Sequence, residues 1–433
     1  MKAASMGSGR KDFFKTAIRD WLYSGRSLAA IPDGYKKRYE VLELKLINLD
    51  HISAAPLLPA VKESMIEAIN GDLHNPSSQH QAGEAAAERL EAAREAVGRL
   101  VGAKDTKEIV FVSGGTESVN HAIKGVAMAN QSKGNHIVTT NIEHNAVIRS
   151  LKRLSGAGFK VTSLPVDESG RVNPEDVAKA ITGKTILVSV MHANNETGTL
   201  QPIREIGAIT REKNILFHSD AVDSVGVVPV SVEELGVDLL SFGSNRFYGP
   251  HGVGGLYVRK GTRIFPLLEG GVQEHNKRGG TENLIGIIGM GKAAELAIRD
   301  METRGAHLSE LKQYLLDNLP KHIDEYLINT NLEHSLPDLL NVSLKYIEGE
   351  SVMLMLDGDG VAVSTKSACA TGSLRASHVL MSLGLSHADA QGTVVLAWGI
   401  DNTKEEMDHF LVSLSECVHT LRSMSPLYRN HNG

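Results

Sequence analysis

Residues 241–257 read Ser-Phe-Gly-Ser-Asn-Arg-Phe-Tyr-Gly-Pro-His-Gly-Val-Gly-Gly-Leu-Tyr, and this stretch decides the fold. A β-rich run from Val237 to Phe242 enters a polar turn, and a Gly/Pro-rich loop then leads into another short strand. Loops at the ends of strands are where α/β proteins usually place their chemistry. Outward from this stretch, strands, polar turns and helices alternate over residues 46–257. The alternation predicts an α/β layer built on a mostly parallel sheet. A run rich in Ala, Glu, Arg and Leu predicts a helix from Gln81 to Val101, and a later helix is predicted from Leu308 to Leu319.

Composition limits the class of protein. The 433 residues are too many for one small core and suit two domains, or one large domain with a smaller partner. A formal net charge of -6 gives no sign of a surface for nucleic acid, and no apolar run approaches the roughly 18 residues that span a membrane. The only cysteines, Cys369 and Cys417, cannot form a disulfide framework. We therefore expect a cytoplasmic protein without nucleic-acid or membrane partners.

One polar turn predicts an anion site. Residues 113–118 read Ser-Gly-Gly-Thr-Glu-Ser and connect a predicted strand, Lys107 to Val112, to a predicted helix. Backbone N–H groups at a helix N-terminus, here at Gly115 and Thr116, can meet a phosphate. A capped helix after a tight turn would have the same sequence, so the turn alone leaves both interpretations open.

Taken together, several stretches resemble the cysteine desulfurases, the sulfur-mobilising branch of the class V aminotransferases. The resemblance spans roughly Asn48 to Phe410, and its motifs are Asn75-Pro-Ser-Ser-Gln-His80, Ser113–Ser118, Glu143-His-Asn-Ala-Val147, Phe247-Tyr-Gly-Pro250 and Arg278-Gly-Gly-Thr-Glu-Asn283. It implies the fold-type I architecture of pyridoxal phosphate (PLP) transferases. Residues 46–300 would form the large domain with a seven-stranded sheet, and residues 301–433 a smaller C-terminal α/β domain. Residues 1–45 would be a helical extension. Residues near 46–65 could pack with the small domain although they lie at the start of the large one in sequence.

The resemblance also assigns roles to residues that match the family. Gly115 and Thr116 would bind the cofactor phosphate, and Thr281 would reach the phosphate of a neighbouring subunit, which implies a homodimer with sites at its interface. Asn195 would contact the ring oxygen. Two further family roles fall on His144 and Asp220.

His144 matches the family histidine that stacks on the pyridine ring and takes part in proton transfer. Its alternative role is to cap a helix N-terminus. Asp220 matches the aspartate that pairs with the pyridine nitrogen and so keeps the ring able to accept electrons.

Other positions depart from the family pattern. Arg246 stands where the family lysine holds PLP as a Schiff base, and Asn245 stands where a histidine precedes that lysine. The family serine falls on Gly243, with Ser244 one place along, and Asp223 replaces the glutamine that donates to the ring hydroxyl. A guanidinium stays protonated and is not a usable nucleophile. The changes work against ordinary PLP binding.

A further departure is Val395, in the stretch Thr393–Gly399, where the family has the arginine that clamps the substrate carboxylate. Valine cannot make that bidentate contact. The turn His51–Ala55, which lines the substrate side of the pocket in the family, has also lost the family's asparagines and threonines. We therefore expect that no amino-acid carboxylate binds at Val395.

The thiol of Cys369 is the strongest remaining chemical feature. Residues 364–374 read Ser-Thr-Lys-Ser-Ala-Cys-Ala-Thr-Gly-Ser-Leu and match the loop whose cysteine becomes a persulfide in the family. Lys366 and Arg375 are departures, and their positive charge either favours the thiolate or is solvated surface charge. Cys417, in an amphipathic helical stretch, is expected to be a buried structural thiol.

Two classes of function follow. The leading hypothesis is a divergent desulfurase homologue that handles sulfur or iron–sulfur clusters through Cys369, as a persulfide acceptor or carrier, a cluster ligand or a scaffold, with sulfur-transfer or iron–sulfur assembly proteins as partners. The alternative is an enzyme that binds PLP, pyridoxamine phosphate (PMP) or another phosphorylated ligand non-covalently, with Arg246 as an added anion contact. A desulfurase that uses another lysine, for which Lys366 is the candidate, and a purely structural subunit are the remaining alternatives.

Overall fold

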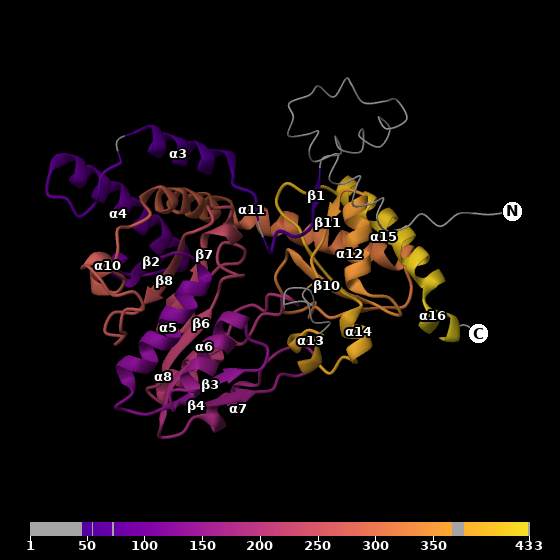
Figure 1. Cartoon of the computed structure of the whole chain (residues 1–433), viewed down its shortest axis with the longest axis horizontal. Helices are drawn as coiled ribbons and strands as arrows, with labels where there is room; N and C mark the ends of the chain where they lie inside the picture. The colour runs from indigo at the N-terminus through magenta and orange to yellow at the C-terminus, as the bar shows by residue number, and fades with distance from the viewer. Residues whose placement is uncertain (1–45, 54, 72, 366–375, 432–433) are drawn as a thin grey trace, which may run out of the picture. The chain divides into compact units, whose positions relative to one another are not determined.

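A seven-stranded sheet organises the larger part of the chain in the computed structural model, which describes residues 46–53, 55–71, 73–365 and 376–431 (Figure 1). In spatial order its strands are β2-β8-β7-β6-β5-β3-β4. Only β8 is antiparallel to its neighbours, β2 and β7. The prediction of a mostly parallel sheet is confirmed. The strands are β2 (Ile109–Val112), β3 (His136–Thr140), β4 (Lys160–Leu164), β5 (Thr185–Ser189), β6 (Leu216–Asp220), β7 (Leu239–Gly243) and β8 (Gly254–Val258).

Helices cover both faces of this sheet. Alternate residues of β2 show this, because Ile109 and Phe111 pack into one apolar cluster whereas Val110 and Val112 pack into another. None of the described helices combines the length and the apolar character needed to cross a membrane. The helical segments around the large sheet are α3 (Pro59–Asn70), α4 (Gln81–Val101), η3 (Thr106–Glu108), α5 (Gly115–Asn130), α6 (Asn145–Ser155), α7 (Pro174–Ala180), α8 (Ile203–Glu212), α9 (Val232–Leu235), η4 (Ser244–Phe247) and α10 (Gln273–Asn276).

Local sequence accounts for the bounds of α4. Its residues are mostly Ala, Glu, Arg and Leu, which favour helix. The His80 side chain accepts a hydrogen bond from the backbone N–H of Gly83 and so caps the first turn, whereas Gly102, with φ of 71°, ends the helix in the left-handed conformation. The sequence prediction of a helix at this position is therefore confirmed.

A second, three-stranded antiparallel sheet, ordered β12-β10-β9, forms in the C-terminal part, and β1 pairs in parallel with β11. Ile47 and Leu49 pack into the apolar cluster of this part. The expected division near residue 300 stays a prediction, and residues 1–45 lie outside the described chain. The elements are β1 (Ile47–Asn48), β9 (Tyr326–Ile328), β10 (Leu339–Leu344), α12 (Gly349–Gly358), β11 (Val361–Ala362), α13 (His378–Ser382), α14 (His387–Gln391), β12 (Thr393–Ala397), α15 (Lys404–Met424) and α16 (Pro426–His431).

Helix α11 (Leu284–His322) is longer than the sequence pattern indicated, since only Leu308–Leu319 was predicted as helical. It packs against α3 and α4 and also against α15. The buried residues of its N-terminal part, such as Ala294, pack in the core of the large sheet, and those of its C-terminal part, such as Leu315, pack in the core of the small sheet. One continuous helix thus contributes to both cores.

A buried ion pair fixes the loop that precedes α11. Arg94 of α4 donates to both carboxylate oxygens of Glu274, at 2.7 and 2.9 Å, and both side chains are almost fully buried. Glu274 also accepts from the backbone N–H of Phe111 at 2.7 Å. These bonds hold Glu274 in a turn where it, His275 and Asn276 all have positive φ. The contact therefore offsets a strained backbone.

We predict that Glu274→Ala lowers the free energy of unfolding by about 3–5 kcal/mol, because it leaves the Arg94 charge buried without its partner. Glu91→Ala is the matched control. Glu91 also bonds Arg94, at 2.9 Å, but its side chain is 47% exposed, so its removal is expected to cost less than about 1 kcal/mol. Urea denaturation measures both values, and equal losses in the two variants would contradict the assignment.

Candidate functional site

The carboxyl ends of β6 and β7 meet the start of α5, and most of the predicted site residues lie there. Gly115, the first residue of α5, lies against Val222, so that a Cβ added to the glycine would be 2.5 Å from the valine side chain. A Cβ added to Gly243, the last residue of β7, would be 3.7 Å from the backbone nitrogen of Gly115. The chain thus brings the predicted phosphate turn next to the stretch that carries Arg246.

The N-terminus of α5 keeps the features of an anion site. Its N-cap residue, Gly114, has φ of 149° and makes no side-chain capping bond, and a Cβ there would meet nothing within 4 Å. The first N–H groups of a helix have no partner within the helix and can meet an anion. Thr116 in the first turn is exposed. Gly115 and Thr116 therefore remain candidates for binding a phosphate.

The Gly243–Ser244–Asn245 segment explains one departure from the family. A Cβ on Gly243 would lie 2.9 Å from the side-chain oxygen of Asn245, so a serine at 243 would require this asparagine side chain to move. The Ser244 hydroxyl is buried and has no hydrogen-bond partner among the described residues. It packs instead against Gly249, where a Cβ would be 2.0 Å from the hydroxyl oxygen. Gly243 thus leaves space for the side chain of Asn245.

Two buried carboxyl groups lie at strand ends: Asp220 is the last residue of β6, and Glu143 follows β3. Burial raises the pKa of Asp220 to about 7, against the hydrogen bond it accepts from the Val222 N–H at 3.1 Å, and the Asp223 carboxylate raises it further. Burial raises the pKa of Glu143 to about 8, although Thr140 and the Met191 N–H both donate to it. Asp220 adds to this effect, so each carboxyl favours the protonated form of its neighbour.

His144 and Asn195 take positions at the same edge. The backbone N–H of Ala146 donates to Nδ1 of His144 at 3.1 Å, so His144 caps α6. The capping alternative considered from the sequence is therefore present, whereas stacking on a cofactor ring stays a prediction. Asn195 is half-buried in the turn after β5, between Asn194 and Glu196. Both side chains remain candidates for contact with a cofactor.

Arg246 is almost fully buried, with 2% of its surface exposed, and it is bound by acceptors from three other segments. Nη2 donates to the Asp338 carboxylate at 2.9 Å and to the backbone oxygen of Asp223 at 3.3 Å. Nη1 donates to the backbone oxygen of His51 at 3.4 Å, and Nε lies 3.5 Å from the Asp223 carboxylate. Burial lowers the pKa of Arg246, but the two carboxylates outweigh it and raise the pKa above its ordinary value.

Val395 and Thr281 lie in contrasting surroundings. Val395 is fully buried in β12 and packs in a small apolar cluster with Leu339, Ala193 and Ile52. Thr281 is exposed on the loop after α10, and we find no hydrogen bond or ion pair from it to the strand-end cluster within the described residues. Its predicted role across a subunit interface stays a prediction.

The thiol loop cannot be placed. Cys369, Lys366 and Arg375 lie outside the described residues, and their expected roles stay predictions. Just before this loop, the backbone of Ser364 exchanges two hydrogen bonds with Val395. On the other side Ser377 donates to the Glu196 carboxylate. Cys417, by contrast, is 1% exposed inside α15, and burial raises its pKa to about 11, which agrees with a structural thiol.

Sequence reasoning missed two members of the site. Asp338 follows Pro337 before a strand, and nothing in that pattern points to an arginine 92 residues away. Glu143 was quoted only as part of the His144 motif. Its neighbours Asn141, His144 and Asn145 are polar, so the sequence carries no signal that Glu143 is buried.

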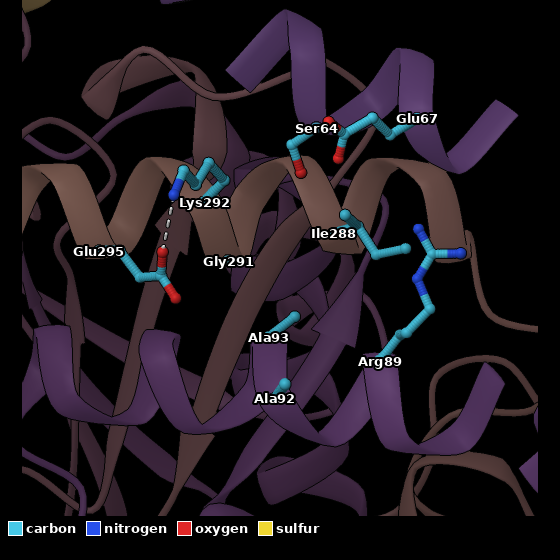
Figure 2. A pocket seen from close by; sticks show the side chains of 9 residues that line it. All are labelled: Ser64, Glu67, Arg89, Ala92, Ala93, Ile288, Gly291, Lys292 and Glu295. Carbon is cyan, nitrogen blue, oxygen red and sulfur yellow. Dashed lines mark hydrogen bonds and ion pairs between the residues drawn. The ribbon is translucent and has the colours of Figure 1, made fainter. Parts of the chain in front are cut away.

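A surface groove lies elsewhere, between α3, α4 and α11 (Figure 2). Its volume is about 280 Å³, and its floor is formed by small residues where the helices approach closely. Lys292 and Glu295 at its rim pair with each other at 3.2 Å. The groove contains none of the predicted site residues, and its lining is Ser64, Glu67, Arg89, Ala92, Ala93, Ile288, Gly291, Lys292 and Glu295.

Comparison with known proteins gives a consistent picture. Residues 47–410 match the family model described as aminotransferase class-V. The chain is 48% identical over 380 residues to a cysteine desulfurase IscS of Dictyoglomus turgidum, covering 88% of this chain and 96% of that protein. It is 44% identical to cysteine desulfurase IscS 1 of Archaeoglobus fulgidus, covering 88% of this chain and 99% of that protein.

A solved structure agrees with the sequence matches. A NifS-like protein superposes with a TM-score of 0.82 at 38% identity, covering 87% of this chain and all of that chain. The mixed α/β model with its large, mostly parallel sheet therefore has the fold-type I architecture that the sequence predicted.

We predict that Glu143→Gln flattens the pH dependence of stability. The pKa of Glu143 is about 8 in the folded protein and about 4.3 in the unfolded chain. Its contribution to stability is therefore fully present below about pH 4.3 and is lost as the pH rises to 8. The amide cannot ionise, so the variant should be more stable than the wild type at pH 8 by about 1–3 kcal/mol, with little gain at pH 5. Urea denaturation at both pH values measures this. Glu88→Gln, at an exposed position of α4, is the control; unchanged pH dependence in Glu143→Gln would contradict the prediction.

Proposed function

The chain belongs to the class-V aminotransferase family and is a cysteine desulfurase homologue, and on this premise we propose that it handles sulfur or iron–sulfur clusters through Cys369 without a Schiff-base cofactor. The observation that carries the proposal is the buried Arg246 side chain at the position of the family lysine. Its guanidinium donates to Asp338, Asp223 and His51. A side chain fixed in this way, and always protonated, does not condense with an aldehyde.

PLP is the cofactor that the family implies, and the residues of this chain fit it only in part. The open space before α5 suits a phosphate next to Gly115 and Thr116, and the buried carboxyl of Asp220 suits a protonated ring nitrogen. Ser244, Asp223 and Arg246 do not reproduce the family's remaining contacts. The aldehyde has no amine to meet at Arg246, so no step of the proposed function passes through the cofactor.

Cys369 would act as an acceptor and carrier of sulfur. Its thiolate would attack the terminal sulfur of a donor persulfide, so that a new S–S bond forms at Cys369 while the S–S bond of the donor breaks and the donor thiolate leaves. The step needs no oxidant or reductant, because sulfane sulfur passes between two thiols. The same thiol is suited to ligate an iron–sulfur cluster, since thiolates are the ligands such clusters prefer.

The proposed partners follow from this chemistry. Sulfur carried as a persulfide must come from a donor and pass to an acceptor, so sulfur-transfer and iron–sulfur assembly proteins are the expected partners. The relatives named cysteine desulfurase support this class of partner. We also propose a homodimer, in which the exposed loop with Thr281 faces the neighbouring subunit.

Conventional desulfuration is the competing function, and the names of the relatives favour it. It requires a lysine amine within reach of the cofactor. Because position 246 is an arginine, a lysine elsewhere in the chain would have to supply that amine. Non-covalent binding of PLP, PMP or another phosphorylated ligand is the second alternative, and the open N-terminus of α5 favours it. The following experiments separate the three functions.

We predict that purified protein incubated with PLP develops no aldimine absorption band and no borohydride-fixed lysine by mass spectrometry, and releases no sulfide from cysteine. Non-covalent binding would appear as a PLP signal that survives without fixation but is lost on denaturation. A borohydride-stable adduct on any lysine, together with sulfide release, would establish the conventional function and overturn the proposal.

We predict that a small-molecule persulfide adds one sulfur atom to Cys369 and that Cys369→Ser abolishes this addition. Cys417→Ala is the matched control, because the Cys417 thiol is buried and its pKa is raised to about 11, and it should leave the addition unchanged. Alkylation followed by peptide mass analysis locates the sulfur. Labelling of Cys417 instead, or equal labelling in both variants, would contradict a carrier role for Cys369.

A further inference from the structure

The side chain of Arg246 joins parts of the chain that are distant in sequence. Arg246 lies in η4 after β7 of the large sheet, and its carboxylate partner Asp338 lies directly before β10 of the small sheet. Its other acceptors, His51 and Asp223, come from the segment after β1 and the turn after β6. One guanidinium therefore connects the two sheets and the first described segment.

Asp338 is buried and depends on this contact. It is 3% exposed; one carboxylate oxygen accepts from Arg246, and the other has no hydrogen-bond partner among the described residues. The neighbouring loop is held from its other side by Lys312 of α11, which donates to the Ser335 hydroxyl at 2.7 Å and to the Leu336 backbone oxygen at 2.8 Å. Removing the arginine would leave a buried carboxylate without its nearest cation, which is a costly arrangement.

The number of donors explains why arginine occupies this place. A guanidinium presents five N–H donors in a plane, whereas an ammonium presents three from a single point. Arg246 uses its two terminal nitrogens on three acceptors that lie 2.9–3.4 Å away in different directions. A lysine at 246 would reach only part of this set.

We infer that Arg246 and Asp338 are a matched pair, in which the ion pair braces the two sheets against each other and at the same time closes the pocket to a Schiff base. This deepens the proposed function and rests on it, because it explains how the chain is held together at the place where its family holds a cofactor. Arg246→Lys alone is expected not to permit a Schiff base, because Asp338 would still pair with the new amine.

The electrostatics of the pocket give the reason. An amine introduced at 246 would lie beside the carboxylates of Asp338 and Asp223, and opposite charges at this range raise the pKa of an amine. The amine would stay protonated and would pair with Asp338 in place of attacking an aldehyde. Replacing Asp338 by the neutral asparagine removes the stronger partner and frees the amine.

The test uses the full-length protein and two independent measurements. Urea denaturation of the ligand-free protein compares the wild type, Arg246→Lys, Asp338→Asn and the double variant. If the residues form a matched pair, the effects of the single changes on the unfolding equilibrium constant differ from additivity by more than tenfold. Asp401→Asn serves as the matched control, because Asp401 is also near this site but its side chain is 55% exposed; its effect should add to that of Arg246→Lys.

The second measurement is borohydride fixation after incubation with PLP, read as an adduct mass on the peptide that contains position 246. We expect no adduct in Arg246→Lys or in Arg246→Lys/Asp401→Asn, and a fixed adduct in Arg246→Lys/Asp338→Asn. Equal amounts of adduct in Arg246→Lys and Arg246→Lys/Asp338→Asn would overturn the inference. So would the lack of an adduct in Arg246→Lys/Asp338→Asn, or additive effects of the two changes on stability. An adduct on another lysine of the wild type would instead overturn the proposed function and leave the measured coupling between Arg246 and Asp338 standing.

Discussion

A guanidinium buried at the end of a parallel strand must find negative charge or carbonyl oxygen, because an unpaired charge in the protein interior costs several kcal/mol. At Arg246 this requirement is met by Asp338, Asp223 and His51 together. Each acceptor belongs to a different segment, so satisfying one side chain fixes the relative positions of η4, the turn after β6 and the loop before β10. The arginine that makes these contacts stands where the family pattern has the lysine amine.

Close contacts at the strand ends pair glycines with larger neighbours. Gly243 leaves room for Asn245, and Gly115 leaves room for Val222. In each pair a missing side chain accommodates a larger neighbour, which keeps the strand ends tightly packed. The open start of α5 and the buried carboxyl of Asp220 persist beside them. The described strand ends thus combine a glycine-rich helix N-terminus and a buried carboxyl with an ion-paired arginine at the position of the family lysine.

The sequence was most informative where structure is local. The alternation of strands and helices predicted the parallel sheet, and residue composition predicted α4 at its observed position, because helix propensity and capping act over a few residues. It was less informative where distant segments meet. Asp338 could not be assigned to Arg246 from 92 positions away, and the greater part of α11 was missed because its first turns lie buried against α3 and α4, without a clear polar face. His144 shows an intermediate case, since its motif was recognised whereas only coordinates reveal that it caps α6.

The left-handed turn at Glu274, His275 and Asn276 has a consequence for the order of folding. Residues other than glycine avoid this conformation, which costs about 1–2 kcal/mol per residue, and the ion pair that offsets the cost comes from Arg94, which is 180 positions earlier in the chain. Because local sequence does not favour such a turn, we expect it to form after α4 has packed against β2. Contacts of this length are closed late, because the entropy of a long loop must be overcome first. The conformation of these three residues is thus a marker that the long-range packing of the large sheet is complete.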